Sequence, residues 1–440
     1  MIFKKIQLYF YTLKDLKISQ FLFHLKFIFI KPKFLNKEWT NKKIFYKKKE
    51  EFNFIEDVND YKKVNFYKKF KLLIKIENQN NKLKKFNLYY LNHILNEKIS
   101  LNKKKDNIKK LYKYSLKNKN SLAWHPYPTS IRLMNLIKFR YSNNVNSKFI
   151  DNFIFSHFCT LIRNLEYNLN ANHLLTNIIA INTFLVTCSL KTEEIKKNKK
   201  KYFNKLDKIL KSQFKFYFHY ENSPKYHLFL IKQILDLEIL KKIVGKKNND
   251  KNILLIKKGL NFILDISHPD KTLPFFNDTN RNHIKVNKIK KKFEDIFGNL
   301  GKFNLKNKIF PIINNKRFKL ITKCCEPSPK YNPGHTHGDN LSFELSILNK
   351  RILTGRGIST YENNNERKIQ RSSKNHNSIE INGLSANEVW NSFRIARKSK
   401  ISNLKISKNS IYAECLGYYH NFRFNVHKRR WILKNKNLQI

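Results

Sequence analysis

The stretch GHTHGDNLSFELS, residues 334–346, puts two histidines and an aspartate in phase with an apolar/polar alternation. From Leu341 onward the apolar residues occupy every second position, and residues two apart on a strand point to one face. If the strand extends backward, His335, His337 and Asp339 lie on that buried side. Buried imidazole and carboxylate groups need partners. Metal ligation, substrate contact or a hydrogen-bond network would each supply them.

Two upstream segments carry further groups that can move or bind protons. Asn172 and His173 lie in LNANHLL, at a break between two apolar helical runs. The amide and the imidazole can bind a carboxylate there, or Asn172 can simply cap the following helix, because asparagine is a preferred N-cap. Tyr226 follows a proline-marked turn in SPKYHLFL. A phenol titrates near about 10, so it readily donates a proton and needs cationic neighbours to act as a base.

The elements that must position these groups change near residue 300. Before it, apolar residues recur at spacings of three and four, which predicts helices over 158–169, 173–186, 226–244 and 252–266. Short polar links between helices favour stacked helical hairpins. After it, alternation predicts strands over 341–347, 378–384 and 411–427, separated by turn-like clusters. We predict a helical domain, 1–300, followed by an antiparallel β domain, 301–440.

The composition indicates a globular protein with an acidic partner. Of its 440 residues 41% are hydrophobic, which is enough for a sizeable core, and the net charge is +57. A basic surface attracts polyanions such as nucleic acid, anionic lipid and acidic polysaccharide. Much of the lysine accompanies asparagine, isoleucine and phenylalanine, whose codons are A/T-rich, so mutational drift is the alternative origin of the charge. The five cysteines form no CxxC pair, which indicates neither a disulfide framework nor a cysteine metal site.

No transmembrane segment or standard signal peptide is predicted. The apolar runs near the start are short and interrupted by Lys14, Asp15, His24 and Lys26, and no small-residue cleavage site follows. The chain stops in RRWILKNKNLQI, which has the pattern of a strand, so the β domain is either complete or shortened at its C-terminus. Nothing in the sequence indicates an oligomeric state.

The segment 329–400 resembles the C-terminal domain of the heparinase II/III family of polysaccharide lyases. It contains YNPGHTHGDNLSFELSILNKRIL, GISTYENNNER and RSSKNHNSIEINGLSANEVWNSFRIARK. The segments 124–139, 164–177 and 220–237 are similar to the family's helical part. YTLKDLKISQFLFHLKF, residues 11–27, is similar to its N-terminus, so we expect the chain to begin there. The resemblance covers most of the chain in the right order.

The resemblance implies an (α/α) toroid of helical hairpins, a C-terminal antiparallel β-sandwich and an active cleft between them. It also implies β-elimination at a uronic acid of an acidic polysaccharide. The carboxylate is neutralised, a base removes the C5 proton, and an acid protonates the departing glycosidic oxygen. A cell-envelope or periplasmic location follows from the same resemblance, and the missing signal peptide leaves the cytoplasm open. The resemblance makes no cofactor certain, and a structural zinc is the one candidate it raises.

The resemblance also assigns roles to the residues singled out above. It implies that Asn172 and His173 hold the substrate carboxylate, with His173 able to act as a base. Tyr226 becomes the general acid or base, with His227 as the less favoured choice. His335 matches the catalytic histidine of the GHxHxD loop, either as a second base or to polarise the carboxylate.

The resemblance further implies a zinc site that this chain does not complete. His337 and His376 match its two histidine positions, but the ligand aspartate of the family's stretch is replaced by Gly355 in RILTGRGISTYE. Glycine offers no side-chain ligand, and Arg356 beside it would repel a cation. Asp339 is a substitute ligand or a loop cap, and His376 is a ligand or a turn histidine.

Arginines and tryptophans supply candidate substrate contacts. Arg371 and Arg394 lie in the matched segment, and arginine binds carboxylate or sulfate through two parallel hydrogen bonds; surface ion pairing is the alternative. Trp124 and Trp390 can stack on sugar rings or pack in the core.

Two other functional classes compete with a lyase. A catalytically inactive relative that binds surface polysaccharide, or acts in its biosynthesis, would fit the substitution at Gly355. A nucleic-acid-binding protein would fit the charge, but no helix-turn-helix, RRM, OB-fold or zinc-finger pattern is present. We therefore expect no nucleic-acid partner.

Overall fold

The computed structural model describes residues 2–39, 43–55, 82–281, 285–305, 307–418, 426–434 and 437–440. The chain forms two compact units. The first is made of Met1–Lys17, Gln213–Ile231 and Lys257–Ile440, and the second of Ile18–Ser212 and Lys232–Ile256. The helices α10 (Pro224–Ile243) and α11 (Asp250–Ile266) each contribute several residues to both units. The predicted domain boundary at residue 300 stays a prediction.

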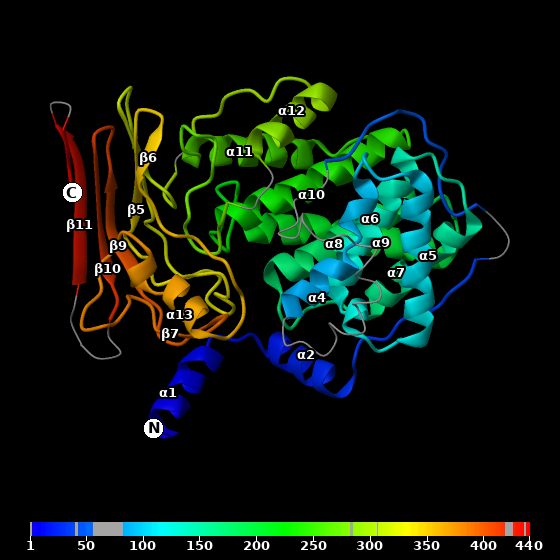
Figure 1. Ribbon diagram of the computed structural model, residues 1–440, viewed down its shortest axis with the longest axis horizontal. Helices are drawn as coiled ribbons and strands as arrows, with labels where there is room; N and C mark the ends of the chain where they lie inside the picture. Colours follow the sequence, from blue (N-terminus) through cyan, green and yellow to red (C-terminus); the bar gives the residue numbers. More distant parts are fainter. Residues whose placement is uncertain are drawn as a thin grey trace. The chain divides into compact units, whose positions relative to one another are not determined.

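Helices make up the second unit (Figure 1). They are α2 (Ile18–Phe29), α4 (Lys82–Tyr89), α5 (Leu101–Lys117), α6 (Pro126–Ser142), α7 (Lys148–Arg163), α8 (Ala171–Thr187) and α9 (Glu193–Gln213), with 3-10 turns η1 (Asn92–Leu95) and η2 (Leu122–Trp124). Helix α6 starts with Pro126, whose fixed φ suits a first helical turn. It packs against α7 and α8. Every residue of α8 other than His173 is buried, so α6 and α8 form the centre of this unit.

Three of the four predicted helices are confirmed. The ranges 173–186, 226–244 and 252–266 coincide with α8, α10 and α11 to within a residue or two. The range 158–169 is half wrong, because α7 ends at Arg163. The Asn164 amide donates to the carbonyl of Thr160 at 2.9 Å and so ends the helix. The remaining residues, although apolar at helical spacing, form a loop that leads to α8.

The first unit contains the sheets. Besides α1 (Ile2–Leu13), α12 (Val286–Phe297), α13 (Asn365–Arg371) and η3 (Ser373–Asn375), it holds two four-stranded antiparallel sheets in the orders β3-β4-β5-β6 and β12-β11-β10-β9. Their strands are β3 (Ile312–Asn314), β4 (Phe318–Thr322), β5 (Phe343–Ile347), β6 (Lys350–Leu353), β9 (Lys400–Ile406), β10 (Ser410–Leu416), β11 (Val426–Lys434) and β12 (Asn437–Gln439). Two short hairpins, β1 (Phe214–Lys215) with β2 (Phe218–His219) and β7 (Val389–Asn391) with β8 (Arg394–Ile395), complete the unit.

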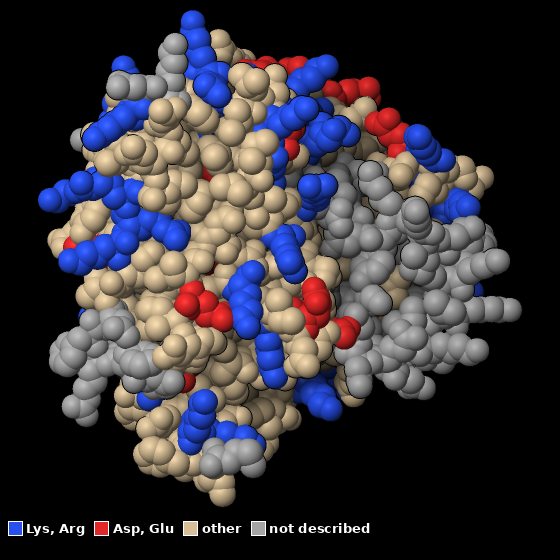
Figure 2. Space-filling view, turned by 60° about the vertical axis from the view of Figure 1, so that its left-hand side comes forward, with Lys and Arg blue, Asp and Glu red and all other residues tan. Residues whose placement is uncertain are grey.

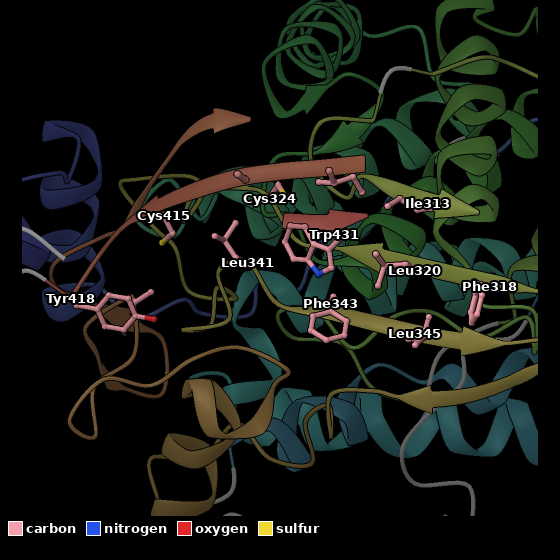
Figure 3. Packing of buried hydrophobic residues seen from close by; sticks show 13 residues of the cluster. Ile313, Phe318, Leu320, Cys324, Leu341, Phe343, Leu345, Cys415, Tyr418 and Trp431 are labelled. Atoms are coloured by element: carbon pink, nitrogen blue, oxygen red, sulfur yellow. The ribbon is translucent and has the colours of Figure 1, made fainter. Parts of the chain in front are cut away.

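One hydrophobic core joins the two four-stranded sheets (Figure 3). In β10 burial alternates, so that Ile411, Ala413 and Cys415 face inward. They meet the fully buried Trp431 of β11 and residues of β4 and β5 such as Leu345. The chain is therefore an α+β protein in which a helical region is followed by antiparallel sheets, as predicted.

The predicted strands are confirmed in part. The range 341–347 corresponds to β5, which begins only at Phe343, because Leu341 has a φ of 53° that no strand continues through. The range 378–384 is wrong, since it holds only an isolated bridge between Ile381 and Leu384. In 411–427 the first half is β10, and residues 419–425 lie outside the described part of the chain.

On one face of the molecule the basic side chains are dispersed (Figure 2). On the face shown in Figure 2, Lys and Arg side chains are spread over the surface, with smaller groups of Asp and Glu among them. Among the described residues no helix has the length and apolarity needed to cross a bilayer.

Candidate active site

Tyr226 and His335 are in direct contact in the first unit. Their rings stack with centroids 3.9 Å apart. Tyr226 lies in the first turn of α10, where Pro224 opens the helix and the Ser223 hydroxyl accepts a hydrogen bond from the Tyr226 backbone N–H at 3.4 Å. The same hydroxyl donates to the carbonyl of Asp278 at 3.1 Å. The helix cap thus ties the tyrosine to the segment that carries Asp278.

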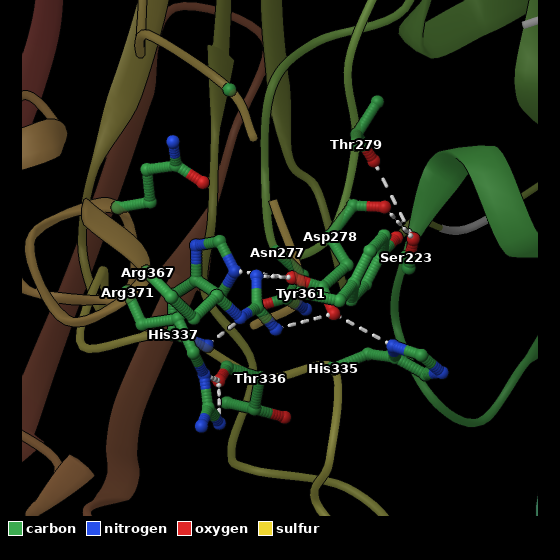
Figure 4. Close-up of polar contacts among 12 residues, drawn as sticks. Ser223, Asn277, Asp278, Thr279, His335, Thr336, His337, Tyr361, Arg367 and Arg371 are labelled. Carbon is green, nitrogen blue, oxygen red and sulfur yellow. Dashed lines mark hydrogen bonds and ion pairs between the residues drawn. The ribbon is translucent and has the colours of Figure 1, made fainter. Parts of the chain in front are cut away.

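Asp278 is the centre of the polar network around this pair (Figure 4). One carboxylate oxygen accepts from His335 Nδ1 at 2.7 Å, and the other accepts from His337 Nε2 at 2.7 Å. The Arg367 guanidinium from α13 donates to both oxygens, at 2.6 and 2.8 Å. The backbone N–H of Asp278 also donates to the His335 carbonyl at 3.1 Å. This buried carboxylate therefore fixes both histidines of the GHTHGD loop.

The charge of Asp278 is stable in this setting. Burial by itself would raise the pKa of the carboxyl, but the Arg367 guanidinium and the two imidazole hydrogen bonds outweigh it and hold the pKa well below the usual range. The carboxylate is therefore ionised. Because it accepts the Nδ1–H of His335, it leaves the Nε2 of that ring as the atom that can take up a proton.

The Tyr226 phenol is held in its protonated form. Burial, followed by the neighbouring Tyr361, Asp278 and Glu221, raises the pKa of this phenol well above its usual value. Its hydroxyl donates to the Tyr361 hydroxyl at 3.2 Å. Such a phenol suits a general acid better than a general base.

His335 faces a second carboxylate on its other side. Its Nε2 lies 3.9 Å from Oε1 of Glu221, which is beyond hydrogen-bond distance. The ring is 10% exposed, and Phe393 stands at its edge with centroids 6.3 Å apart. The imidazole thus combines a fixed orientation with an Nε2 that faces the Glu221 carboxylate.

Asn172 and His173 belong to the helical unit, at the start of α8. The helix is capped by Asn170, whose side chain accepts from the Ala171 N–H at 3.0 Å. Capping by Asn172, the structural alternative raised from the sequence, is therefore wrong. Asn170 and Ala171 have φ values of 56° and 49°, a region that L-residues rarely adopt. The backbone immediately before Asn172 is thus tightly constrained.

A carboxylate also orients His173. Glu166 Oε1 lies 3.1 Å from its Nδ1, and the ring of Tyr127 lies against the imidazole, with centroids 4.3 Å apart. Glu166 is itself held by Asn177, which hydrogen-bonds both its side chain and its backbone N–H. The His173 side chain is 27% exposed, whereas that of Glu166 is 7% exposed. An oriented, accessible imidazole suits binding or proton transfer.

His227, the alternative to Tyr226, has a packing role. Its Nδ1 accepts from the His219 N–H at 3.1 Å, and its Nε2 bonds the carbonyl of Gly259 at 3.0 Å. Burial lowers the pKa of this imidazole to about 3. It is fully buried and neutral, so it offers no group to a substrate.

The histidines of the implied zinc site do lie together. His337 Nδ1 and His376 Nε2 are 3.1 Å apart, and these residues with Asp339 place three potential ligand atoms within 4.8 Å of one another. A Cβ built on Gly355 would lie 3.1 Å from the His376 ring. The position where the family's pattern has an aspartate thus adjoins the cluster.

The charges of the cluster do not fit a zinc ion. The buried Lys323 ammonium bonds the Asp339 carboxylate, and it also donates to the Asn277 side chain at 2.6 Å. Asp339 is therefore already neutralised, and the ammonium beside it would repel a divalent cation. His337 uses its second nitrogen on Asp278. With glycine at 355 in place of an anionic ligand, we derive no step through a metal.

The structure gives little support to the expected substrate contacts. Arg371 is fully buried and donates to the backbone carbonyls of Thr336 and Asn391. Trp124 is also fully buried and stacks on Phe34 with centroids 4.0 Å apart. Both therefore pack inside the fold, and neither has surface to offer a sugar.

The two remaining candidates are more accessible. Arg394 is half-buried in β8. Trp390 is half-buried in β7, where its indole N–H donates to the Thr12 hydroxyl of α1 at 3.0 Å. Arg394 stays a predicted substrate contact, and Trp390 has a packing partner.

Sequence reasoning missed four residues of this network. Asp278 lies in a segment without a recognisable motif, whereas Glu221, Tyr361 and Arg367 lie in segments that resemble the family but were not singled out there. Asp278 stands 57 positions before His335, so no local pattern joins them. The scarcity of acidic residues, 32 against 89 basic ones, was the available signal, because a carboxylate in an apolar setting such as LPFFNDT needs a reason to be there.

Comparison with known proteins supplies independent findings. The sequence model described as Heparinase II/III N-terminus matches residues 27–304, and the one described as Heparinase II/III-like, C-terminal matches residues 303–440. No curated protein matches the sequence.

Solved structures with a similar fold include two lyases. One, a crystal structure of heparinase III, has a TM-score of 0.58 and 15% identity, and the match covers 81% of this chain but only 60% of that one. The other, the heparan sulfate lyase HepC from Pedobacter heparinus, has a TM-score of 0.51 and 16% identity, with 96% and 67% covered. At these identities the likeness shows the fold.

Proposed function

Because the chain belongs to the heparinase II/III family, we propose that it is a lyase that cleaves an acidic, uronic-acid-containing polysaccharide by β-elimination. The observation that carries the proposal is the stacking of Tyr226 on His335, an imidazole oriented by the buried Asp278. β-Elimination requires a base that removes the proton of the C–H bond and an acid that protonates the oxygen of the C–O bond. These two residues in contact offer both groups.

The protonation states favour one division of labour. His335 removes the C5 proton of the uronate through Nε2, and the Asp278 carboxylate stabilises the imidazolium that forms. Tyr226, whose phenol keeps its proton, donates that proton to the departing glycosidic oxygen. The electron pair of the C–H bond becomes the new double bond, and the C4–O bond breaks.

The uronate carboxylate must be neutralised before its neighbouring proton becomes acidic. We assign this role to Asn172 and His173, as the family resemblance implies. His173 is suited to it because Glu166 orients the imidazole while the side chain stays partly exposed. The net charge of +57 also favours encounter with a polyanion. We further propose a cell-envelope or periplasmic location, where such polymers lie.

The test is a substrate panel assayed by ultraviolet absorbance of the unsaturated uronate product. Alginate, heparan sulfate, chondroitin sulfate and bacterial capsule polymers are the substrates to try first. Tyr226→Phe retains the ring that stacks on His335 and removes only the hydroxyl, so we expect activity to fall by about 10²–10⁴-fold with the fold intact. Tyr412→Phe, on β10 of the same unit, is the matched control and should keep full activity.

Two results would overturn this assignment. If Tyr226→Phe keeps the activity of the parent, the Tyr226 phenol is not the general acid. Tight polymer binding without any unsaturated product would favour the second candidate, a non-catalytic relative in surface-polysaccharide binding or biosynthesis. The observation that favours this second candidate is Gly355, which stands where the family's pattern has a ligand aspartate.

A further inference from the structure

Helix α2 exposes a continuous apolar stripe. Its members recur at the three- and four-residue spacing of one helix face, and they are Ile18, Phe21, Leu22, Leu25, Ile28 and Phe29. Their exposed fractions run from 38% at Leu25 to 81% at Phe29. Single exposed apolar side chains are normal on a protein surface, whereas a contiguous patch of them marks an interaction site.

The opposite face of α2 is fixed to its own unit. The buried Gln20 amide donates to the carbonyl of Asn168 at 3.2 Å, and the Phe23 ring packs on Tyr167 with centroids 4.6 Å apart. The Lys26 ammonium donates to the carbonyl of Arg163 at 3.3 Å. These contacts turn the apolar stripe outward and keep it there.

The chain that forms and follows the stripe carries charge of one sign. Between Asp15 and Glu38 the sequence has no acidic residue and five lysines, Lys17, Lys26, Lys31, Lys33 and Lys37. The three that follow the helix, Lys31, Lys33 and Lys37, are exposed. An apolar face flanked by lysines is the pattern of helices that lie in the interface of an anionic bilayer.

This combination decides between the possible occupants. A second copy of the chain would bring the same lysines to the contact, and like charges repel. A polyanionic sugar would satisfy the lysines but leave the phenylalanines and leucines in water. An anionic bilayer satisfies both, because acyl chains cover the stripe and headgroups meet the lysines. With 12 residues, α2 is too short to span a bilayer and would lie along its surface.

Helix α1 repeats the pattern within the other unit. Its exposed apolar residues include Ile2, Phe3, Ile6 and Phe10. Its other face is anchored, since Arg397 donates to the Gln7 side chain at 3.2 Å and Thr12 receives the Trp390 N–H. Each unit therefore presents an exposed apolar helix face.

We propose that α2 docks this protein on the surface of an anionic membrane. The proposal is independent of the lyase reaction, because none of these residues belongs to the candidate active site. It gives the protein a second binding function: attachment to a lipid surface.

Flotation of the full-length chain with lipid vesicles tests the proposal. We expect binding to vesicles of phosphatidylcholine mixed with phosphatidylglycerol, weak binding to phosphatidylcholine alone, and loss of binding at high salt. The double variant Leu22→Gln/Phe29→Gln should bind at least about tenfold more weakly. Leu348→Gln, which removes a 66% exposed apolar side chain elsewhere, should bind like the parent.

The other outcomes overturn the proposal. Equal binding to neutral and anionic vesicles would show that the lysines do not select anionic lipid. No flotation with either kind of vesicle would show that the protein does not bind a membrane. If the parent is a dimer by light scattering and the double variant a monomer, a second copy covers the stripe instead. All substituted positions are exposed, so circular dichroism should confirm a folded chain in each case.

Discussion

At the scale of residues, the candidate site depends on one acidic side chain that the sequence did not reveal. Asp278 joins His335, His337 and Arg367, and its own backbone is hydrogen-bonded to the His335 carbonyl. The histidines therefore obtain their orientation from a residue on another segment. A carboxylate at this position also balances a buried guanidinium, so it has a structural role besides the catalytic one that we propose.

The structural role predicts a large stability loss for Asp278→Asn. The substitution keeps the shape but leaves Arg367 buried and unpaired, which should cost about 3–5 kcal/mol in the free energy of unfolding. His335→Gln removes a neighbour of the same carboxylate while leaving the ion pair intact, and should cost clearly less. Urea unfolding followed by circular dichroism measures both values.

A double variant separates the ion pair from other effects. Asp278→Asn/Arg367→Met removes both charges, so we expect it to be more stable than Asp278→Asn alone. Equal losses for the two aspartate variants would show that the guanidinium is not stabilised by Asp278, contrary to the geometry.

Sequence reasoning found Tyr226 and His335 because each lies in a motif, and the structure brings these two rings together. It could not find Asp278 and Arg367, which are the partners of the histidines. Their contacts depend on how the segment 273–279 and α13 fold against the GHTHGD loop. It also named Trp124 and Arg371 as candidate substrate contacts, although both are buried. Residue type alone does not distinguish a guanidinium that binds backbone carbonyls from one that faces solvent.

At the scale of elements, alternation predicted the sandwich strands well where one face is buried and the other is not. In β10 the inward residues alternate as expected. In β5 both faces are covered, since Phe343 and Leu345 face the sandwich core while Glu344 bonds His268 at 2.9 Å. The prediction that His335, His337 and Asp339 extend the strand backward on its buried side is therefore wrong, because the chain turns at Leu341 before the strand begins. Burial of the three residues, which it predicted, is nevertheless observed.

The sandwich core predicts a sharp difference between two isoleucines. Ile411 of β10 is fully buried in the core, while its cross-strand neighbour Ile406 on β9 is 45% exposed. Ile411→Ala should lower the free energy of unfolding by about 2–5 kcal/mol, because it removes buried methylenes and leaves a cavity. Ile406→Ala is the matched control and should cost less than about 1 kcal/mol, since little buried area is lost.

The urea concentration at the unfolding midpoint measures the stability of each variant, provided that the slope of the free energy of unfolding against urea is unchanged. Similar losses for the two variants would contradict the packing of β10 against the facing sheet. A change in slope would instead report a change in the unfolded state.

At the scale of the whole molecule, the excess of positive charge coexists with many histidines held neutral in both units. Burial is the main cause that lowers the pKa of these imidazoles, which are His93, His157, His219, His227, His337 and His427. Protonating them would add charge to a chain that already carries +57. The fold therefore depends on their staying neutral.

This dependence predicts that the protein loses stability in mild acid. A histidine whose pKa is lower in the folded state than in the unfolded chain binds fewer protons when folded, so stability rises with pH through that window and falls as pH drops below about 6.5. His227 and His337 have pKa values lowered to about 3. At pH 5 each should then have lost about 2 kcal/mol of its contribution at neutral pH. Thermal unfolding should show a falling Tm from pH 7 to pH 5.

The pH range of the effect, and not its sign, distinguishes this cause from carboxylate titration. Asp278, whose pKa lies well below its usual range, keeps its charge throughout that window and loses its contribution only at lower pH. Above about pH 7.5 the histidines are almost entirely neutral in both states, so the Tm should change little between about pH 7.5 and 8.5. A Tm that is unchanged between pH 7 and pH 5 would contradict neutral burial of the histidines. Proton uptake on unfolding at pH 5, measured by comparing the unfolding enthalpy in buffers of different ionisation enthalpy, should be positive and should exceed one proton per chain.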